Sequence, residues 1–497
     1  MSEALRLLTA LRRQGVTPGG ISADSRQVVP GDVFVALPGG RRDGRSFIQE
    51  AVARGAVAVL RERSGDEPAN GKFTVAVPNM AVTGLQAICG ELADLIYDHP
   101  SEKLWMFGVT GTNGKTSVSQ WIAQAFNLLG RKCGVIGTLG SGFPGQLMEN
   151  PNTTPDAISL QRTLAGFVVA GAEACAMEAS SIGLDQERTH PIAVDVAVFT
   201  NLTRDHLDYH ASMEAYAAAK SKLFEVPHLA VAILNLDDEF GARLHAKLAG
   251  TGVRRIGYTL GKPSAIPADE IIRAEGLQLA DQGLRFTIHA AQGEARVEVP
   301  LFGRFNAANL LAVLGSLLAS GIPFEKAVAV LPQLAPPPGR MQALGGNRKP
   351  LLVVDYAHTP DALEQVMTTL REVAAARGGK LLCVFGCGGE RDPGKRPLMG
   401  AIVARLADVA IVTSDNPRGE DPHAIIADIL RGMRPGVTVE ADRAAAIHAA
   451  VRQARQQDVV LIAGKGHETY QEIAGQRLRF SDLEQANDSL ASWRIAA

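Results

Sequence analysis

The sequence predicts an α/β protein of three domains. A small α/β N-terminal domain precedes a central P-loop-type domain, whose mostly parallel sheet has helices on both faces, and a C-terminal Rossmann-like doubly wound domain follows. The 497 residues, 46% of them apolar, exceed what one hydrophobic core normally organises. Short apolar runs also alternate with segments of helical periodicity, which is typical of parallel sheets with crossover helices.

The first two domains are expected over residues 1–97 and 98–335. In the first, turns rich in Gly and Pro separate short apolar runs, which predicts strands at DVFVAL, AVAVL and FTVAV. The segment IYDHPSEK is typical of a linker. Beyond it, buried strands are predicted at LWMFGVTG, AEACAMEA, DVAVFTN and LAVAILNLD, and a helix at KTSVSQWIAQAFNLLG.

The third domain is expected over residues 336–497. It begins at PPPGR, because consecutive prolines cannot continue a helix. Four apolar runs follow, each ending in a polar or glycine-rich loop: LLVVDYAH, LLCVFGCGG, DVAIVTSDNP and DVVLIAGKGH. Ligands of doubly wound sheets bind at the loops that follow the strands, so we expect binding residues there.

Charge, apolar run length and cysteine content argue against several kinds of partner and location. The 50 Lys plus Arg nearly balance the 52 Asp plus Glu, so no general field attracts nucleic acid or an anionic membrane. No apolar run has the length of a membrane span, and charges interrupt the first residues too early for a signal peptide. The five scattered cysteines suit thiols in a reducing compartment. We expect a cytoplasmic monomer without nucleic-acid or membrane partners.

The segment TGTNGKTS, residues 110–117, is predicted to bind phosphate. It follows an apolar run and opens a helical pattern, but Val109 stands where the common P-loop has its first glycine, so the loop is a shortened one. Backbone N–H groups and the helix N-terminus would attract phosphate, while Lys115 reaches the terminal phosphates and Thr116 offers a hydroxyl to Mg²⁺. A plain helix cap would not require both of these side chains.

Further metal-binding candidates follow two later apolar runs. Glu178 ends the run ACAME, at the rim of the same predicted sheet, where an ion beside the loop could reach its carboxylate. The segment NLTRDHLDYH concentrates Asp205, His206, Asp208 and His210. Each of these four could also be an ordinary solvated loop residue, so the cluster alone leaves both interpretations open.

Lys220 lies four residues after Tyr216 and four before Phe224, on the apolar face of a predicted helix. A lysine on such a face tends toward the neutral amine, and a neutral amine can add CO₂ to form a metal-binding carbamate. A lysine that extends its ammonium to solvent fits the same spacing. The spacing alone does not exclude either.

These motifs, with LFGRFNAANLLA, PPPGRM and VVDYAHTPD, resemble those of the Mur ligases of peptidoglycan precursor synthesis, in the same order nearly from end to end. DSRQVVPGDVFVALPGG, NTTPD, FGCGGERD, SDNPRGED and AGKGHE are similar to the members that add meso-diaminopimelate. The resemblance implies an ATP-dependent ligase. A carboxylate of a UDP-N-acetylmuramoyl dipeptide would be activated as an acyl phosphate and attacked by meso-diaminopimelate, with ATP as co-substrate and two Mg²⁺ ions.

The resemblance also implies roles for individual residues. The catalytic residues would be Lys115, Glu178, His206 and Lys220. The metal ligands would be Thr116, Glu178, His206 and Lys220, with Lys220 in the form of its carbamate. ATP would contact Gly111, Thr112, Asn113, Gly114, Lys115, Thr116, Ser117, Asn306, Arg340 and Asp355, with His358 near its phosphates. The UDP-muramoyl dipeptide would contact Ala23, Ser25, Gly40, Arg41, Arg42, Asn152, Thr153, Thr154, Ser180, Gln186 and Arg188. Diaminopimelate would contact Arg391, Asp415, Asn416, Pro417, Arg418, Gly464 and Glu468.

Arg418 is the residue expected to separate diaminopimelate from lysine. Diaminopimelate has one extra carboxylate at its far end, which a guanidinium binds through two parallel hydrogen bonds. Lysine would leave the guanidinium without an anionic partner, a loss of about 2 to 5 kcal/mol in a dry site. Taken alone, the string DNPR is more typical of an Asx turn stiffened by proline than of a binding loop.

Three alternatives differ in substrate or class: a lysine-adding ligase of the same family, a folylpolyglutamate synthase-like ligase, and a non-catalytic nucleotide-gated switch. The uridine-type first domain and DNPR disfavour the folate ligase. Two predicted metal positions disfavour the switch, because simple nucleotide binding does not need them. One departure from the family pattern is Ile182, which stands where the relatives have a histidine in SSHGL.

Overall fold

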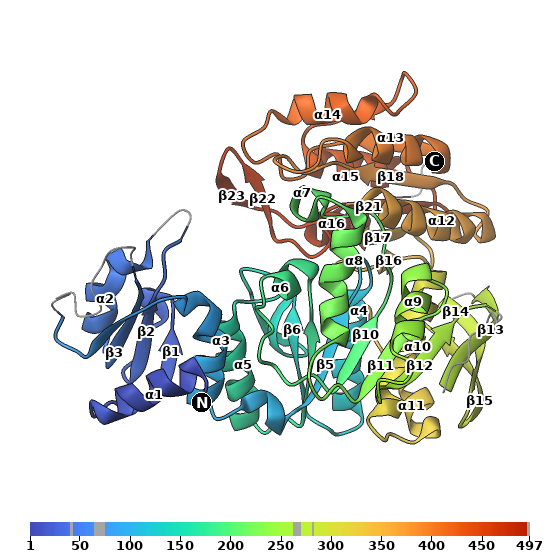
Figure 1. The fold of residues 1–497 in the computed structure, drawn as a ribbon. Helices are drawn as coiled ribbons and strands as arrows, with labels where there is room; N and C mark the ends of the chain where they lie inside the picture. Colours follow the sequence, from blue (N-terminus) through green and yellow to red (C-terminus); the bar gives the residue numbers. More distant parts are fainter. Residues whose placement is uncertain (40–42, 64–74, 262–269, 281–282, 495–497) are drawn as a thin grey trace.

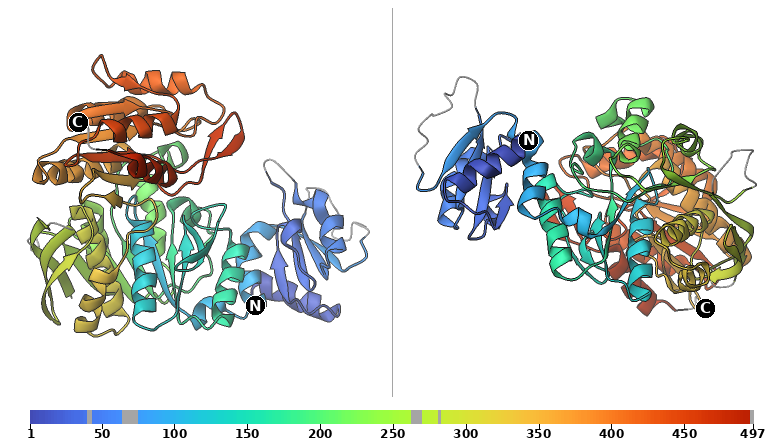
Figure 2. Two further views of the ribbon diagram at one scale, coloured as in Figure 1. Left: turned by 180° about the vertical axis from the view of Figure 1, so that it is seen from behind. Right: turned by 60° about the horizontal axis from the view of Figure 1, so that its bottom comes forward.

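The computed structural model describes residues 1–39, 43–63, 75–261, 270–280 and 283–494 (Figure 1). In this part of the chain, sheets of 4, 11 and 6 strands follow one another along the sequence, with a separate two-stranded hairpin near the C-terminus. The first unit lies beside the central one, and the C-terminal unit packs on top of the central unit (Figures 1 and 2). The α/β architecture of three units agrees with the fold class that the sequence predicts.

The N-terminal sheet is wholly parallel and has the strand order β1-β2-β3-β4. Its elements are α1 (Glu3–Arg13), β1 (Gly20–Ser22), β2 (Asp32–Ala36), α2 (Ile48–Ala53), β3 (Ala58–Glu62), β4 (Asn79–Val82) and α3 (Leu85–Ile96). The predicted strand FTVAV is wrong for residues 75–77, and residues 73–74 lie outside the described part. Val75 and Val77 pack irregularly against the core around Phe34, and strand pairing begins at the Pro78 carbonyl, which accepts from Val59 N.

The central sheet has the strand order β15-β14-β13-β12-β11-β10-β5-β9-β6-β7-β8. Its strands are β5 (Trp105–Thr110), β6 (Cys133–Gly137), β7 (Gly140–Phe143), β8 (Gln146–Met148), β9 (Ala174–Glu178), β10 (Val196–Phe199), β11 (Val231–Asn235), β12 (Arg254–Thr259), β13 (Glu270–Ala280), β14 (Gly283–Ala290) and β15 (Gly293–Val299). The strands from β13 to β6 are parallel, and antiparallel strands extend both ends.

Helices cover both faces of this sheet, as predicted. They are α4 (Lys115–Leu128), α5 (Ala157–Val169), α6 (Ser181–Asp185), α7 (Leu207–His210), α8 (Met213–Ser221), α9 (Glu239–Lys247), α10 (Arg304–Ala319) and α11 (Phe324–Val330). Alternate residues of β5 enter different cores: Phe107 packs with α4 and α10, while Met106 packs with α5 and α9. This double covering explains why the strand reads as one continuous apolar run.

The C-terminal sheet has the order β16-β17-β21-β18-β19-β20, with only β16 antiparallel to its neighbour. Its strands are β16 (Gln342–Gly345), β17 (Leu351–Asp355), β18 (Leu381–Phe385), β19 (Val409–Val412), β20 (Thr438–Val439) and β21 (Val459–Ala463), and the hairpin is β22 (Tyr470–Ile473) with β23 (Gln476–Arg479). The helices are α12 (Pro360–Ala376), α13 (Lys395–Leu406), α14 (Pro422–Leu430), α15 (Arg443–Gln453) and α16 (Asp482–Ser492).

Arg162 of α5 joins the first unit to the central one. Its guanidinium donates to the carboxylate of Asp32 and the carbonyl of Ile21, both at 2.7 Å, and to the Tyr97 hydroxyl at 3.0 Å. Helix α3 also packs closely on the central unit, since a Cβ at Gly90 would lie 2.3 Å from the His190 carbonyl. None of the helices described combines the length and apolarity that a membrane crossing would require.

Candidate active site

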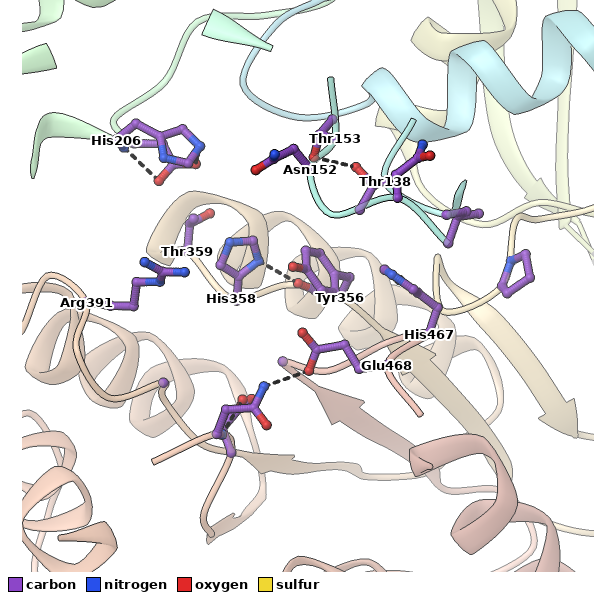
Figure 3. A pocket seen from close by; sticks show the side chains of 18 of the residues that line it. Thr138, Asn152, Thr153, His206, Tyr356, His358, Thr359, Arg391, His467 and Glu468 are labelled. Atoms are coloured by element: carbon purple, nitrogen blue, oxygen red, sulfur yellow. Dashed lines mark hydrogen bonds and ion pairs between the residues drawn. The ribbon is translucent and has the colours of Figure 1, made fainter. Parts of the chain in front are cut away.

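The carboxyl ends of the central and C-terminal strands enclose a cavity of about 1370 Å³. A smaller cavity of about 250 Å³ adjoins it at residues 110–117, hereafter the phosphate loop. Both are lined by Thr138, Asn152, Thr153, Ile182, Asp205, His206, Tyr356 and His358. In Figure 3, side chains of the central unit face those of the C-terminal unit across this space. The cavity can therefore bring together groups bound to two units.

The phosphate loop joins β5 to α4 in a conformation that requires glycine. Gly111 has a φ of +146°, and a Cβ there would lie 1.9 Å from the Thr200 hydroxyl. Lys115 Nζ donates to the Gly111 and Thr112 carbonyls, both at 2.9 Å. Burial lowers the pKa of Lys115, against the opposing charges of Glu178 and Asp205. The amine thus lies within the loop that it would serve in phosphate binding.

Glu178 lies at the floor of the smaller cavity and is only 1% exposed. Its Oε2 accepts from the Thr116 hydroxyl at 3.0 Å and from the Thr138 hydroxyl at 3.1 Å, and its Oε1 accepts from Thr138 N at 2.8 Å. Thr138 was not predicted as a site residue. It could have been found from its position directly after the apolar run CGVIG, which forms β6 beside and parallel to β9.

Lys220 is buried, with 1% of its surface exposed, so it does not extend to solvent. Its Nζ donates to the Gly111 carbonyl at 2.8 Å and lies 4.4 Å from the Tyr216 ring centroid. Burial, assisted by the charge of Lys115, lowers the pKa of Lys220 well below its usual value. Lys222 instead forms an exposed ion pair with Asp185 at 3.1 Å. Lys220 therefore has the environment of a neutral amine.

The segment after β10 divides between cavity and packing. His206 has a φ of 52°, donates its backbone N–H to Asp205 Oδ1 at 2.8 Å and lines both cavities. Burial raises the pKa of Asp205, but the charges of His206, His358 and Lys115 outweigh it and lower the pKa overall. His210 is buried instead, with Nε2 2.9 Å from the Ser181 hydroxyl. The Asp208 side chain lies outside the described part.

The residues around the smaller cavity suit Mg²⁺ bound together with a nucleotide. The Thr116 hydroxyl and the Glu178 carboxylate offer hard oxygen atoms 3.0 Å apart, and His206 and Lys220 line the same cavity. Protein sites for Mg²⁺ commonly supply one or two carboxylates and leave the remaining positions to phosphate and water. The described residues contain no cluster of three or more His, Cys, Asp or Glu side chains that could hold a metal ion.

Arg340 brings the C-terminal unit to the phosphate loop. Its Nη2 donates to the Thr116 hydroxyl at 3.2 Å, and its guanidinium lies 4.5 Å from the Tyr356 ring centroid. Beside it, burial and the Lys395 charge lower the pKa of His358 to about 4. His358 Nδ1 is 2.9 Å from the Tyr356 carbonyl, which fits a donating Nδ1–H and leaves Nε2 as an acceptor.

The far wall of the larger cavity contains the loop of Asp415, Asn416 and Arg418. Asn416 Nδ2 donates to Glu468 Oε2 at 2.8 Å. Lys465, which is 0% exposed, donates to the same Glu468 oxygen at 2.7 Å and to Asn416 Oδ1 at 2.9 Å. Lys465 lies in the motif AGKGHE, but it was not predicted as a site residue, because its role depends on contacts with a distant loop.

Arg418 is held by backbone groups on both sides. Its Nη1 donates to the Gly389 carbonyl at 2.6 Å, and its backbone N–H donates to the Glu472 carbonyl at 3.0 Å. Gly464, which follows β21, has a φ of +117°, and a Cβ there would lie 2.5 Å from Asp415 Oδ2. Arg391, Asp415, Asn416, Arg418, Gly464 and Glu468 all line the larger cavity, whereas Pro417 does not.

Several predicted nucleotide and dipeptide residues do not line either cavity. Asn306 Nδ2 donates to the Phe302 carbonyl at 2.8 Å, and the Asp355 carboxylate accepts from Met341 N and Ala357 N, both at 2.7 Å. Burial raises the pKa of Asp355. Gly111, which shapes the loop, is likewise absent from the linings, whereas Thr112, Asn113, Gly114, Lys115, Thr116 and Ser117 line the smaller cavity.

The predicted dipeptide residues are spread over two units. Asn152, Thr153, Ser180 and Arg188 line the smaller cavity, while the buried Thr154 donates to the Glu178 carbonyl at 2.9 Å. Gln186 accepts from Arg188 at 2.6 Å. In the first unit Ala23 is exposed and the Ser25 hydroxyl donates to Glu50 at 3.0 Å. Gly40, Arg41 and Arg42 lie outside the described residues.

Family models match most of the chain. They are described as "Mur ligase family, catalytic domain" (residues 19–97), "Mur ligase middle domain" (109–317) and "Mur ligase, glutamate ligase domain" (339–466). A protein of Pseudomonas aeruginosa named UDP-N-acetylmuramoyl-L-alanyl-D-glutamate–2,6-diaminopimelate ligase is 52% identical over 96% of this chain and 95% of its own. A protein of Ectopseudomonas mendocina with the same name is 50% identical over the full length of both chains.

Solved structures agree with these relatives. A structure with the same protein name is 38% identical, covers 96% of this chain and 95% of its own, and has a TM-score of 0.66. MurF from Acinetobacter baumannii, at 19% identity and 98% coverage of both chains, has a TM-score of 0.69 and supports the fold alone. The chain belongs to the Mur ligase family.

Proposed function

We propose that this chain is an ATP-dependent ligase that adds meso-diaminopimelate to UDP-N-acetylmuramoyl-L-alanyl-D-glutamate, with release of ADP and phosphate. Relatives 50% identical over the whole chain carry the name of this activity, and the family forms amides at the cost of ATP. The observation that carries the proposal is the position of Arg418, which lines the same cavity as His206 of the central unit, and His206 also lines the cavity beside the phosphate loop. An anionic amino acid bound at Arg418 would thus face the nucleotide.

The three units would divide the substrates between them. Residues 1–97 would bind the uridine nucleotide, residues 98–335 would bind ATP and carry the activation step, and residues 336–497 would bind the amino acid. The cavity between the second and third units supports this division, because the Arg418 loop lines it and the phosphate loop lines the adjoining smaller cavity. The reaction would take place in the cytoplasm, where the five described cysteines, all unpaired and buried, would stay reduced.

The reaction would proceed in two transfers. A carboxylate oxygen of D-glutamate attacks the γ-phosphorus of ATP, the bond to the bridging oxygen of ADP breaks, and an acyl phosphate forms. The amine of diaminopimelate, after losing a proton from its ammonium form, attacks the acyl carbon, and phosphate leaves with the electron pair of the broken C–O bond. Lys115 and Arg340 would bind phosphate oxygens from opposite sides of the cleft and hold the reacting groups in line.

Thr116, Glu178, His206 and Lys220 would hold Mg²⁺ in this site. When bound, the metal neutralises charge on the phosphates and so reduces repulsion of the attacking carboxylate. The neutral amine of Lys220 would add CO₂, forming an N–C bond with loss of one proton. The carbamate would place a carboxylate-like ligand on a buried and hence well-fixed side chain.

Phosphate release tests the proposal directly. The full-length chain would be supplied with Mg²⁺, ATP and the UDP-muramoyl dipeptide, together with meso-diaminopimelate, lysine or no amino acid. We expect release with meso-diaminopimelate alone. Equal release with lysine would favour the lysine-adding alternative. If neither amino acid caused phosphate release, this family of reactions would be rejected for the chain.

Replacing Arg340 with alanine should weaken ATP use selectively. Its guanidinium contacts Thr116 in the phosphate loop, and a charge-assisted hydrogen bond of this type contributes about 1.5 to 3 kcal/mol. We therefore expect kcat/KM for ATP to fall about tenfold to a hundredfold, with a much smaller change in KM for the amino acid. ATP titrations at saturating dipeptide and amino acid measure the first effect, and an equal change in both constants would contradict it.

A further inference from the structure

The hairpin of β22 and β23 holds the loop that contains Arg418. Gln471 Nε2 donates to the Asp415 carbonyl at 2.7 Å, and Glu472 N donates to Asn416 Oδ1 at 2.9 Å. Ala474 N donates to the Arg418 carbonyl at 2.7 Å, and Arg418 N donates to the Glu472 carbonyl at 3.0 Å. The backbone of the hairpin thus fixes where Arg418 stands, whatever the charge of the side chains on the hairpin.

The Glu472 side chain adds a second, electrostatic contact. Its Oε2 lies 3.7 Å from Arg418 Nε, and the two side chains are 27% and 21% exposed. Glu468 and Glu420 pair with other cations, Lys465 at 2.7 Å and Arg396 at 2.8 Å. Glu472 is the carboxylate that pairs with Arg418.

Each edge of the guanidinium that could bind a carboxylate already has a protein oxygen nearby. A guanidinium binds a carboxylate through two neighbouring nitrogens, either Nε with Nη2 or Nη1 with Nη2. Nη1 donates to the Gly389 carbonyl at 2.6 Å, which the backbone fixes because Gly389 N donates to the Asn416 carbonyl at 2.9 Å. Glu472 lies near the Nε edge, beyond hydrogen-bond distance, and lines neither cavity, so its charge acts on Arg418 from outside the space that would hold the amino acid.

We infer that Glu472 is an affinity-tuning counter-ion, whose negative charge partly offsets the charge of Arg418 and so weakens the attraction of the far carboxylate of diaminopimelate. This inference rests on the proposed function. Because the charge of Glu472 reduces the positive potential that Arg418 presents to the cavity, Glu472 weakens amino-acid affinity. It also leaves Arg418 partnered in the absence of its ligand, which disfavours capture of unrelated anions at the cavity wall.

Glu472→Gln tests the inference because it removes the charge and keeps the side-chain size and the backbone contacts. We expect KM for meso-diaminopimelate to fall about twofold to fivefold, the range for a partly exposed ion pair, while kcat and KM for ATP stay unchanged. The measurement is phosphate release by the full-length chain at saturating ATP and dipeptide. Glu484→Gln is the matched control, since Glu484 pairs with Arg479 at 3.1 Å with both side chains largely exposed and lines neither cavity.

Two results would overturn the inference. An unchanged KM for meso-diaminopimelate in Glu472→Gln would mean that the charge of Glu472 does not weaken binding at Arg418. A raised KM, with a thermal unfolding midpoint equal to that of the parent, would mean that Glu472 contacts the substrate. Failure of the unaltered chain to use meso-diaminopimelate at all would instead reject the proposed function, so the two failures are distinguishable.

Discussion

Lys220→Ala is expected to lower kcat at least about a hundredfold, because a lost metal ligand removes about 3 kcal/mol or more of transition-state stabilisation. Lys220 is buried beside the phosphate loop, and burial with the Lys115 charge favours its neutral amine, the form that adds CO₂. Small carboxylates such as acetate or formate are expected to restore part of the activity by occupying the position of the carbamate. Phosphate release with and without added carboxylate measures both effects.

The control is Lys222→Ala, two residues further along the chain and on the exposed side. Lys222 pairs with Asp185, and both side chains are more than 40% exposed, so its loss should change kcat by less than about twofold. A folded Lys220→Ala protein that small carboxylates do not rescue would argue against the carbamate. Full activity without Lys220 would exclude any role of its side chain in the reaction.

Arg418→Ala is expected to lower kcat/KM for meso-diaminopimelate about a hundredfold or more. Truncating one partner of a buried charge pair costs about 2 to 5 kcal/mol, and 2.7 kcal/mol corresponds to about a hundredfold. Arg418 lines the larger cavity but not the phosphate-loop cavity, so KM for ATP should change by less than about twofold. Titration of each substrate at saturating levels of the others separates the two constants.

Two further variants sharpen the Arg418 result. Arg418→Lys keeps the charge and loses the paired N–H groups, so it should recover only a small part of the lost affinity. Arg479→Ala removes an arginine of the same hairpin that is 85% exposed, and it should behave as the parent. Equal losses for ATP and meso-diaminopimelate in Arg418→Ala would indicate a general folding defect and would remove the support for Arg418 as the selecting residue.

The parts of the site that follow apolar strands could be predicted from the sequence. Lys115, Glu178 and His206 come after β5, β9 and β10, which lie side by side and parallel, so their carboxyl ends meet at one edge. Lys220 was also found, because its position among Tyr216 and Phe224 placed it on the buried face of α8 and the turn that follows. In these cases local periodicity determines where the side chain points.

Other parts depended on contacts that the sequence does not display. The three strands β13 to β15 were missed, although β14 alternates buried and half-buried residues, as an antiparallel strand with one solvated face does. Lys465 binds Asn416, 49 positions earlier in the chain, and its burial follows from that long-range contact. The roles of Asn306 and Asp355 rest on the family resemblance. Here both side chains bond to nearby backbone groups, and they remain predictions as ATP contacts.

Competition between amino acids tests whether Arg418 selects meso-diaminopimelate over lysine. The full-length chain would be supplied with ATP, Mg²⁺, the UDP-muramoyl dipeptide and equal concentrations of meso-diaminopimelate and lysine. Mass spectrometry would then identify the uridine-linked product by its mass. We expect one product from the parent protein, with a mass larger than that of the dipeptide substrate by diaminopimelate less water. In Arg418→Ala, the amount of the lysine product should rise relative to the diaminopimelate product. A parent protein that forms the lysine product in equal or greater amount would contradict the assignment of Arg418 as the selecting residue.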